Sequence, residues 1–242
     1  MIYLFLYDIY NIMYMLMMLL LCFVPYMFPY NINIGSTGLL FPYTLGALAY
    51  IKTYIKPCDY KLLGVSGGTW CSIIYHFEKN ITDHDMLWSI LVGNKTQTVY
   101  LLNRKSMSKF QIKVAENFKN RYKDVDVSNI PISILTTQLQ GCVPNNVLIN
   151  SFENMDDLVN YCMCSSYIPF LSGNGINMIY KNQKYMDGEI FKNKGLLLKD
   201  PILHLHKGTW KRKFKLRDYI YLDFNSSKRL FEYGWKDAEK HL

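Results

Sequence analysis

The pentapeptide Gly64-Val65-Ser66-Gly67-Gly68 is the feature that most constrains the fold of this 242-residue chain. Residues 59–63 before it are typical of a short apolar strand, and residues 69–75 after it are typical of a helix. A G-x-S-x-G sequence between a strand and a helix is typical of a nucleophile elbow, a sharp turn that holds the serine hydroxyl clear of the backbone. Its three glycines are expected where a Cβ atom would clash between strand and helix. We therefore expect Ser66 to be a nucleophile at the positive end of a helix.

The charges of the chain are unevenly distributed. Its first fifty residues carry one charge, Asp8, so that all 27 lysines and arginines, which give the chain its net charge of +8, belong to the remainder. A basic body of this kind favours phospholipid headgroups or nucleic acid as partners. The sequence has no zinc-finger spacing or other nucleic-acid-binding motif, so we expect lipid and not nucleic acid. The six cysteines are irregularly spaced among apolar residues, which predicts buried free thiols.

Residues 9–30 are almost uniformly apolar and approach the roughly 20 residues needed to span a bilayer. Pro25 and Pro29 would interrupt a long helix. Two interpretations stay open: a buried first helix, or a membrane anchor or embedded hairpin. We expect residues 1–30 to form a separate hydrophobic segment and the protein to be associated with membranes, on their intracellular side.

A second glycine-containing loop precedes the elbow. Residues 31–34 predict a strand, and residues 39–54 predict a helix in which Gly46-Ala47 forms a close-packing step. The loop between them is Gly35-Ser36-Thr37-Gly38, a backbone conformation suited to holding an anion. It lacks the G-K-[ST] of a phosphate loop, so we do not expect it to bind a nucleotide. We expect it to form an oxyanion hole, in which backbone N–H groups face a carbonyl oxygen as it gains charge.

The second half of the chain continues the alternation of strands and helices. Residues 80–130 predict polar helices, and residues 130–137 and 146–149 predict strands joined by a turn. Asn154 is expected to cap a helix, and residues 183–186 predict a strand that ends in the turn Asp187-Gly188. This alternation predicts a mixed, mainly parallel sheet between helices.

A serine nucleophile needs a base, and the sequence offers two solutions. His204 or His206 could complete a Ser-Asp-His triad with Ser66 and Asp187, as in α/β-hydrolases. In the other solution Asp187 accepts the hydroxyl proton directly, which requires a carboxylate that is fixed by a tight turn and shielded from water. Asp187-Gly188 is the best-placed candidate for such a dyad.

Five segments together resemble a known family: G-S-T-G-L-L-F-P-Y-T-L-G, G-V-S-G-G, V-L-I-N-S-F-E-N-M-D-D-L, C-S-S-Y-I-P-F and Y-M-D-G. Their order over about residues 32–188 is similar to that of the patatin-like phospholipases, most of all the branch of the adipose triglyceride lipases and adiponutrin. The resemblance implies a three-layer α/β/α sandwich with a mainly parallel central sheet. It implies Ser66 as nucleophile, Asp187 as its dyad partner and Gly35, Ser36, Thr37 and Gly38 as the oxyanion loop. The implied activity is hydrolysis of acyl esters in phospholipids or neutral glycerolipids, in membranes or lipid droplets, with no metal or organic cofactor.

Some residues depart from the family pattern. Ser36 and Thr37 stand where the family loop is richer in glycine, and Glu189 adds a carboxylate that would raise the pKa of Asp187. The competing hypothesis is therefore a catalytically weak or inactive, membrane-anchored lipid-binding module. We expect residues 31–190 to be the catalytic domain.

Residues 191–242 are expected to form a basic C-terminal extension that packs on the catalytic domain. Trp210 and Phe214 lie among its densest charges, at Lys211-Arg212-Lys213 and Lys215. Aromatic rings beside basic residues suit an anionic membrane surface. The alternative is a solvated charged face with a packed tryptophan.

Overall fold

The computed structural model describes residues 30–57, 59–141, 143–191, 196–198 and 201–242 of the chain. In chain order the elements are β1 (Tyr30–Ile34), η2 (Gly38–Leu40), α2 (Phe41–Tyr50), η3 (Ile51–Ile55), β2 (Tyr60–Val65), α3 (Gly67–Phe77), α4 (His84–Leu91), β3 (Val99–Tyr100), α5 (Arg104–Tyr122), β4 (Ile132–Gln140), β5 (Val143–Ile149), α6 (Met155–Ser165), β6 (Met178–Tyr180), β7 (Gln183–Met186), β8 (Leu203–Leu205), α7 (Leu216–Ile220), β9 (Tyr221–Leu222) and α8 (Phe224–His241). The hydrophobic segment expected at 1–30 lies outside the described residues, apart from Tyr30.

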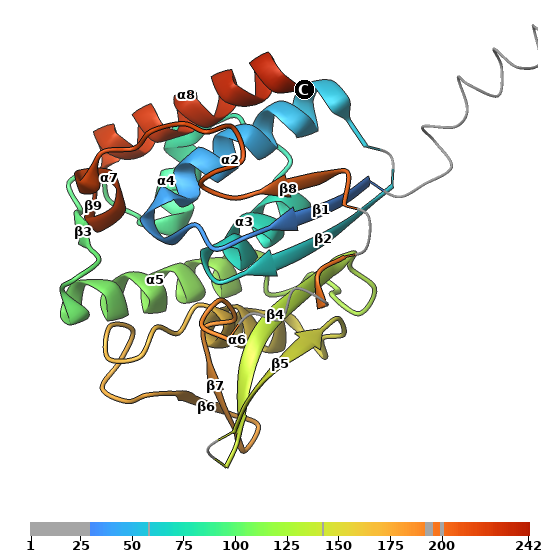
Figure 1. Ribbon diagram of the computed structural model, residues 1–242, viewed down its shortest axis with the longest axis vertical. Coiled ribbons are helices and arrows are strands. Elements are labelled where there is room, and N and C mark those ends of the chain that lie inside the picture. The colour runs from blue at the N-terminus through green and yellow to red at the C-terminus, as the bar shows by residue number, and fades with distance from the viewer. Residues whose placement is uncertain (1–29, 58, 142, 192–195, 199–200) are drawn as a thin grey trace, which may run out of the picture.

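A mixed sheet with a parallel centre organises the chain (Figure 1). Its strands follow the order β6-β7-β4-β2-β1-β8, and β5 pairs with β4. The pairings of β4 with β2, β2 with β1 and β1 with β8 are parallel, whereas β5, β6 and β7 pair antiparallel. The architecture is therefore mixed α/β, with a mostly parallel central sheet flanked by helices, and it is consistent with a three-layer α/β/α fold.

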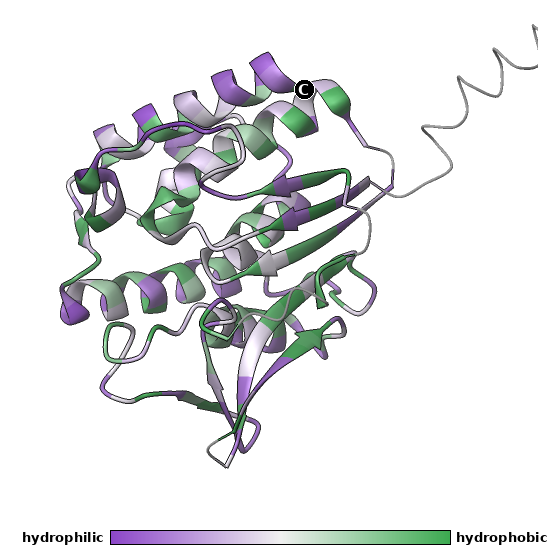
Figure 2. Ribbon diagram, in the orientation of Figure 1, coloured by the Kyte–Doolittle hydropathy of each residue, from purple (hydrophilic) through white to green (hydrophobic). Residues whose placement is uncertain are grey.

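The two faces of the sheet are covered differently. Ile32, Ile34 and Leu62 belong to the main core with the helices, whereas Leu63 belongs to a smaller cluster on the other face, because side chains alternate along a strand. The smaller cluster is covered, among the described residues, by Leu148 and by Leu196, Leu197 and Leu198. In α5, Figure 2 shows hydrophobic and hydrophilic residues alternating along the helix, as expected when one side faces the core.

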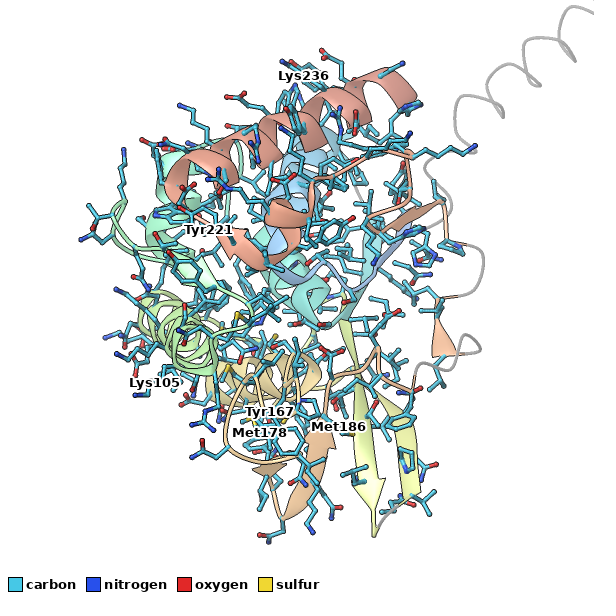
Figure 3. The ribbon with its side chains drawn as sticks, turned by 60° about the vertical axis from the view of Figure 1, so that its left-hand side comes forward. Lys105, Tyr167, Met178, Met186, Tyr221 and Lys236 are labelled. Atoms are coloured by element: carbon cyan, nitrogen blue, oxygen red, sulfur yellow. The ribbon has the colours of Figure 1, made fainter. Side chains whose placement is uncertain are left out.

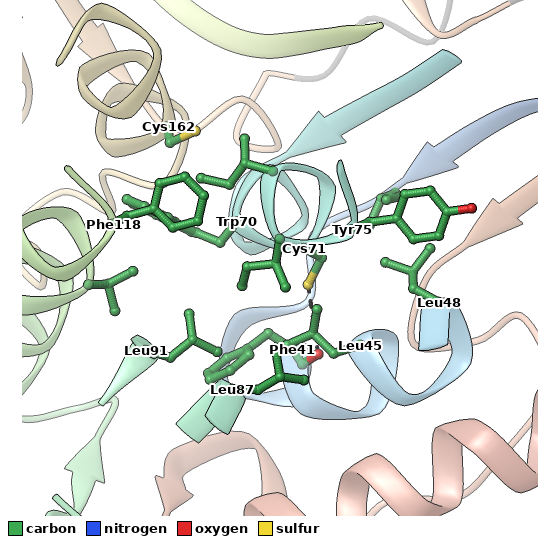
Figure 4. Close-up of a cluster of buried hydrophobic side chains, with 14 of the residues drawn as sticks. Phe41, Leu45, Leu48, Trp70, Cys71, Tyr75, Leu87, Leu91, Phe118 and Cys162 are labelled. Atoms are coloured by element: carbon green, nitrogen blue, oxygen red, sulfur yellow. Dashed lines mark hydrogen bonds between the residues drawn. The ribbon is translucent and has the colours of Figure 1, made fainter. Parts of the chain in front are cut away.

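The helix that follows the elbow, α3, lies in the middle of the main core (Figure 4). Its Trp70, Cys71 and Tyr75 are buried with Phe41 of α2 and Phe118 of α5. The predicted free thiols are confirmed where the structure describes them, because Cys71, Cys162 and Cys164 are buried and unpaired. Burial raises the pKa of the Cys164 thiol to about 12, so it stays protonated at neutral pH. This packing fixes the start of α3, and with it Ser66.

The helix predicted over 39–54 is divided into three parts. It begins as the 3₁₀ turn η2, continues as α2 and ends as the π-helical turn η3, which stops at Lys56 with φ of 47°. Residues 80–130 contain α4 and α5, as expected, but also the short strand β3. β8 of the C-terminal region adds to the sheet edge beside β1, while α8 packs along α2.

The aromatic residues of the basic C-terminal region pack inside the protein. The ring centroids of Trp210 and Phe214 lie 6.3 and 5.0 Å from that of Tyr43, and both side chains are half-buried. Arg212 forms an ion pair with Asp237 of α8 at 2.5 Å, and the Tyr43 hydroxyl donates to the same carboxylate at 2.7 Å. These contacts favour the alternative of a packed tryptophan.

Arg212→Gln is expected to lower the free energy of unfolding by about 2–3 kcal/mol, because it leaves the buried Asp237 carboxylate without its charged partner. Lys213→Gln is the matched control, because Lys213 is exposed, and it should change stability by less than about 0.5 kcal/mol. Thermal unfolding of the two variants measures the difference. Equal stability of both variants would show that the ion pair of Arg212 with Asp237 does not stabilise the fold.

Candidate active site

Ser66 occupies a strained turn between β2 and α3. Its φ of 55° and ψ of −129° lie in a region that non-glycine residues rarely adopt, at a cost of about 1–3 kcal/mol. The glycines beside it allow α3 to lie close to β1 and β2. A Cβ atom at Gly68 would lie 2.3 Å from the carbonyl oxygen of Ile34, and one at Gly64 would lie 2.6 Å from the Cα of Thr69. The turn therefore presents the Ser66 side chain at the N-terminus of α3.

The register of the sheet brings Ser66 and Asp187 together. β2 runs parallel to β4, with Val65 opposite Leu135, while β7 runs antiparallel to β4, with Met186 opposite Thr137. The residue that follows each strand therefore arrives at the same position of β4, Thr136. Two strand ends that approach from opposite directions thus place the hydroxyl and the carboxylate face to face.

Hydrogen bonds fix the carboxylate of Asp187 on both of its oxygens. The Ser66 hydroxyl donates to Oδ2 at 2.5 Å, and the backbone N–H of Glu189 donates to Oδ1 at 2.8 Å. The Thr137 hydroxyl donates to the carbonyl oxygen of Asp187 at 3.0 Å. Behind the turn, a Cβ atom at Gly188 would lie 2.2 Å from the carbonyl oxygen of Leu135, so this position has no room for a side chain.

The environment of Asp187 makes it a stronger base than a solvated aspartate. Burial raises the pKa of its carboxyl group to about 6, although the hydrogen bonds from Ser66 and from the Glu189 N–H act in the opposite direction. The expected effect of the Glu189 carboxylate, which also raises this pKa, is smaller than that of burial. At neutral pH Asp187 is mostly ionised and is placed to accept the proton of the Ser66 hydroxyl.

If Asp187 is the base, ester hydrolysis should fall as the pH drops through about 6, because only the ionised carboxylate accepts a proton. The pH profile of kcat/KM for a soluble ester measures this pKa in the free protein. A profile with its midpoint near 4 would contradict the buried position of Asp187.

The free energy of unfolding should also depend on the ionisation of Asp187, but it should fall with rising pH where the activity rises. The folded protein binds the Asp187 proton more tightly than the unfolded chain does, so ionisation above pH 6 costs folding free energy on the order of 3 kcal/mol. Asp187→Asn removes this cost and should unfold at a higher temperature than the parent at pH 8. The difference should shrink below pH 6 and disappear below about pH 4.

The four residues of the loop expected to form the oxyanion hole have different surroundings in the structure. Gly38 is exposed, has a φ of 51° and lines one pocket together with Ser66 and Gly67. A Cβ atom at Gly67 would lie 3.2 Å from the backbone nitrogen of Gly38, so the two N–H groups are neighbours. Neither N–H group hydrogen-bonds to any residue that the structure describes. The Gly38 and Gly67 N–H groups are therefore the donors best placed for an oxyanion.

The other members of the loop are differently engaged. The N–H of Gly35 donates to the carbonyl oxygen of Leu205 at 2.8 Å, within the pairing of β1 with β8. Ser36 lines a separate hollow with Gly35. The Thr37 side chain is buried, and its hydroxyl makes no hydrogen bond of ordinary geometry with a described residue, although it lies close to the Cys71 thiol.

The pocket beside Ser66 is apolar along most of its wall. It runs between η2, α3 and α5, and polar groups other than Ser66 are contributed by Gln111 and Ser166. The hydrophobic side chains that line it are Leu39, Phe41, Trp70, Leu91, Leu101, Met107, Phe110, Val114 and Ile168. Such a wall suits a hydrocarbon chain whose polar end lies at Ser66.

The histidines proposed for a triad lie elsewhere. His204 and His206 line the hollow that contains Gly35, Ser36 and Glu189, and their ring centroids are 5.1 Å apart. Neither lines the pocket beside Ser66, and the Asp187 oxygens bond to Ser66 and the Glu189 N–H. The geometry therefore brings together a Ser66–Asp187 pair.

No family model matches this chain. No curated protein matches it either. Among the residues that the structure describes, none of the helices combines the length and the apolar character needed to cross a bilayer.

The sequence analysis assigned no role to Ser165, which hydrogen-bonds to both the turn at Ser66 and the turn at Asp187-Gly188. Its hydroxyl accepts the Ser66 N–H at 2.9 Å and donates to the carbonyl oxygen of Leu135 at 2.7 Å. Its carbonyl oxygen accepts the N–H of Gly188 at 3.1 Å. The signal in the sequence is a serine pair, Ser165-Ser166, directly after the apolar run 161–164 at the end of α6, where buried hydroxyls need partners.

Proposed function

We propose that the protein is a serine hydrolase that cleaves fatty-acyl esters through a Ser66–Asp187 dyad. The observation that carries this proposal is the 2.5 Å contact from the Ser66 hydroxyl to a buried carboxylate, at a strained turn beside an apolar pocket. A hydroxyl is a weak nucleophile until a positioned base removes its proton. Asp187 supplies that base.

In the proposed mechanism, Asp187 accepts the Ser66 proton as Ser66 Oγ attacks the ester carbonyl carbon. The Gly38 and Gly67 N–H groups and the positive end of α3 stabilise the oxyanion, and one such donor contributes about 3 kcal/mol. Asp187 then returns the proton to the leaving alcohol, and an acyl-enzyme remains. Water, deprotonated by Asp187, attacks this ester and releases the fatty acid with regeneration of Ser66.

Two further observations support a lipid substrate. The apolar wall of the pocket suits an acyl chain better than a polar acyl group, and the net charge of +8 suits anionic headgroups. The resemblance to patatin-like phospholipases supports phospholipids or neutral glycerolipids as the substrate class and a patatin-type arrangement of the α/β fold. We place the protein at membranes or lipid droplets, on the intracellular side.

The test is fatty-acid release from defined lipids. Phosphatidylcholine vesicles and triglyceride emulsions are incubated with the parent protein and with Ser66→Ala, and the released fatty acids are measured by mass spectrometry. We expect release by the parent alone. Binding to either lipid without release would favour a lipid-binding module with an inactive site, and release by both proteins would exclude Ser66 as the nucleophile.

A further inference from the structure

The two most exposed large hydrophobic side chains of the described residues belong to segments that adjoin the lining of the Ser66 pocket. They are Leu216, 75% exposed, and Leu102, 71% exposed. Leu102 follows Leu101, which lines the pocket, and Leu216 begins α7, which packs against η2 with the pocket residue Gly38. Exposed leucines are unremarkable singly, but a group around a pocket marks a contact surface.

The segments that carry these two leucines are in contact. The N–H of Leu101 donates to the carbonyl oxygen of Ile220 at the end of α7, at 3.0 Å. Leu102 shares a shallow hollow with Tyr100 and Ile220. In Figure 1, α7, β3, β9 and the start of α5 all lie on the left-hand side, and Figure 3 turns that side toward the viewer, with Lys105 and Tyr221 labelled.

A third apolar side chain extends from a neighbouring loop. Phe170 is 60% exposed and has a positive φ of 63°, while its N–H donates to the carbonyl oxygen of Gly175 at 3.2 Å. The loop is therefore folded back on itself with an aromatic ring turned to solvent. Its start, Ile168, lines the Ser66 pocket, and its Gly173 shares a hollow with the first turns of α5.

The same face is basic. Exposed cations lie on the same segments: Arg104, Lys105 and Lys109 on α5, and Lys215 directly before α7. The nearest acids are engaged, because Asp218 is buried and paired with Arg229, and Asp223 lies 3.9 Å from Arg217. Positive charge around apolar tips is complementary to an anionic lipid layer, which attracts the cations while the tips enter its interface.

We infer that this face, formed by Leu102, Phe170 and Leu216 with these cations, docks on an anionic lipid surface. The pocket opening then lies within the contact, so that an acyl chain passes from the lipid layer to Ser66 without crossing water. This last step rests on the proposed function. The docking itself does not.

Vesicle binding tests the docking separately from catalysis. All variants carry Ser66→Ala in the full chain, and binding is measured by co-sedimentation with phosphatidylcholine vesicles that contain or lack phosphatidylserine. Leu102→Asp with Leu216→Asp should weaken binding to anionic vesicles at least about tenfold, which corresponds to about 1.4 kcal/mol. The matched control is Ile179→Asp, because Ile179 is 69% exposed but lies on β6, which is not one of the elements that form this face, and it should leave binding unchanged.

The charges are tested by a second variant that does not alter the apolar side chains. Lys105→Gln with Lys109→Gln should weaken binding to anionic vesicles by about fivefold for each charge and leave binding to neutral vesicles unchanged. Thermal unfolding checks that each variant is folded.

Equal binding by the leucine variant and by Ile179→Asp would overturn the inference. So would a leucine variant that changes the sedimentation velocity of the free protein but not its vesicle binding, because the face would then join two protein molecules. The leucine variant could lose vesicle binding while the parent protein, with Ser66 intact, releases no fatty acid. In that case the docking surface stands and the proposed hydrolysis fails.

Discussion

Ser66→Ala is expected to lower kcat for ester hydrolysis by about a thousandfold or more, because the other hydroxyl that lines the pocket, that of Ser166, donates to the carbonyl oxygen of Cys162 and not to a carboxylate. Asp187→Asn should cause a loss of similar size, since an amide cannot accept the Ser66 proton at its 2.5 Å contact. The double variant should be little worse than either single variant, because residues that act as one unit are not additive.

The histidines provide the control for this dyad. His204→Ala should leave kcat for a soluble ester within a few-fold of the parent, since the His204 ring lines a hollow separate from the Ser66 pocket. A large loss in His204→Ala or His206→Ala, with activity retained in Asp187→Asn, would instead require a triad.

Gly234→Ala is expected to have the largest effect on stability. A Cβ atom at Gly234 of α8 would lie 1.8 Å from the carbonyl oxygen of Tyr43, and one at Gly46 of α2 would lie 1.9 Å from that of Phe231. The two helix backbones are therefore in direct contact and must separate to admit a methyl group. We expect a loss of at least about 3 kcal/mol, despite the gain of about 1 kcal/mol in helix propensity.

Thermal unfolding measures this loss as a decrease in Tm of about 6–12 °C. Gly175→Ala is the matched control, because the nearest atom to an added Cβ there is 3.5 Å away, an ordinary contact distance. Equal Tm values for the two variants would show that α2 and α8 are not packed as closely as described.

Local structure could be predicted from the sequence because it depends on residues that are neighbours along the chain. The strand, turn and helix around Ser66 follow from the spacing of glycines and apolar residues. The turn at Asp187-Gly188 follows from the Asp-Gly pair after a short predicted strand. The close-packing step expected at Gly46 also matches the contact of α2 with α8.

Non-local geometry could not be predicted in the same way. Ser66 and Asp187 are 121 positions apart, and only the pairing of both strands with β4 brings them to Thr136. The contact of Arg212 with Asp237 likewise depends on where α8 packs. The sequence shows a cationic run there, but it does not show which of its charges is engaged in the fold.

The predicted helix over 39–54 illustrates a different difficulty. The apolar pattern is continuous, yet the structure divides it into 3₁₀, α-helical and π-helical turns. The 3₁₀ turn η2 contacts α3 and α7, and hydrophobic periodicity carries no signal for such contacts. The division matters because Gly38, the proposed oxyanion donor, belongs to the 3₁₀ turn.

The central claim is that Ser66 is a nucleophile activated by Asp187. A fluorophosphonate reacts with an activated serine hydroxyl and leaves a phosphonyl group on Oγ, which intact-protein and peptide mass spectrometry locate. We expect one adduct, on the peptide that contains Ser66, that forms more slowly as the pH falls through about 6 and is absent from Ser66→Ala and Asp187→Asn. An unmodified Ser66 in the folded parent protein, or equal labelling of the parent and Asp187→Asn, would contradict the claim.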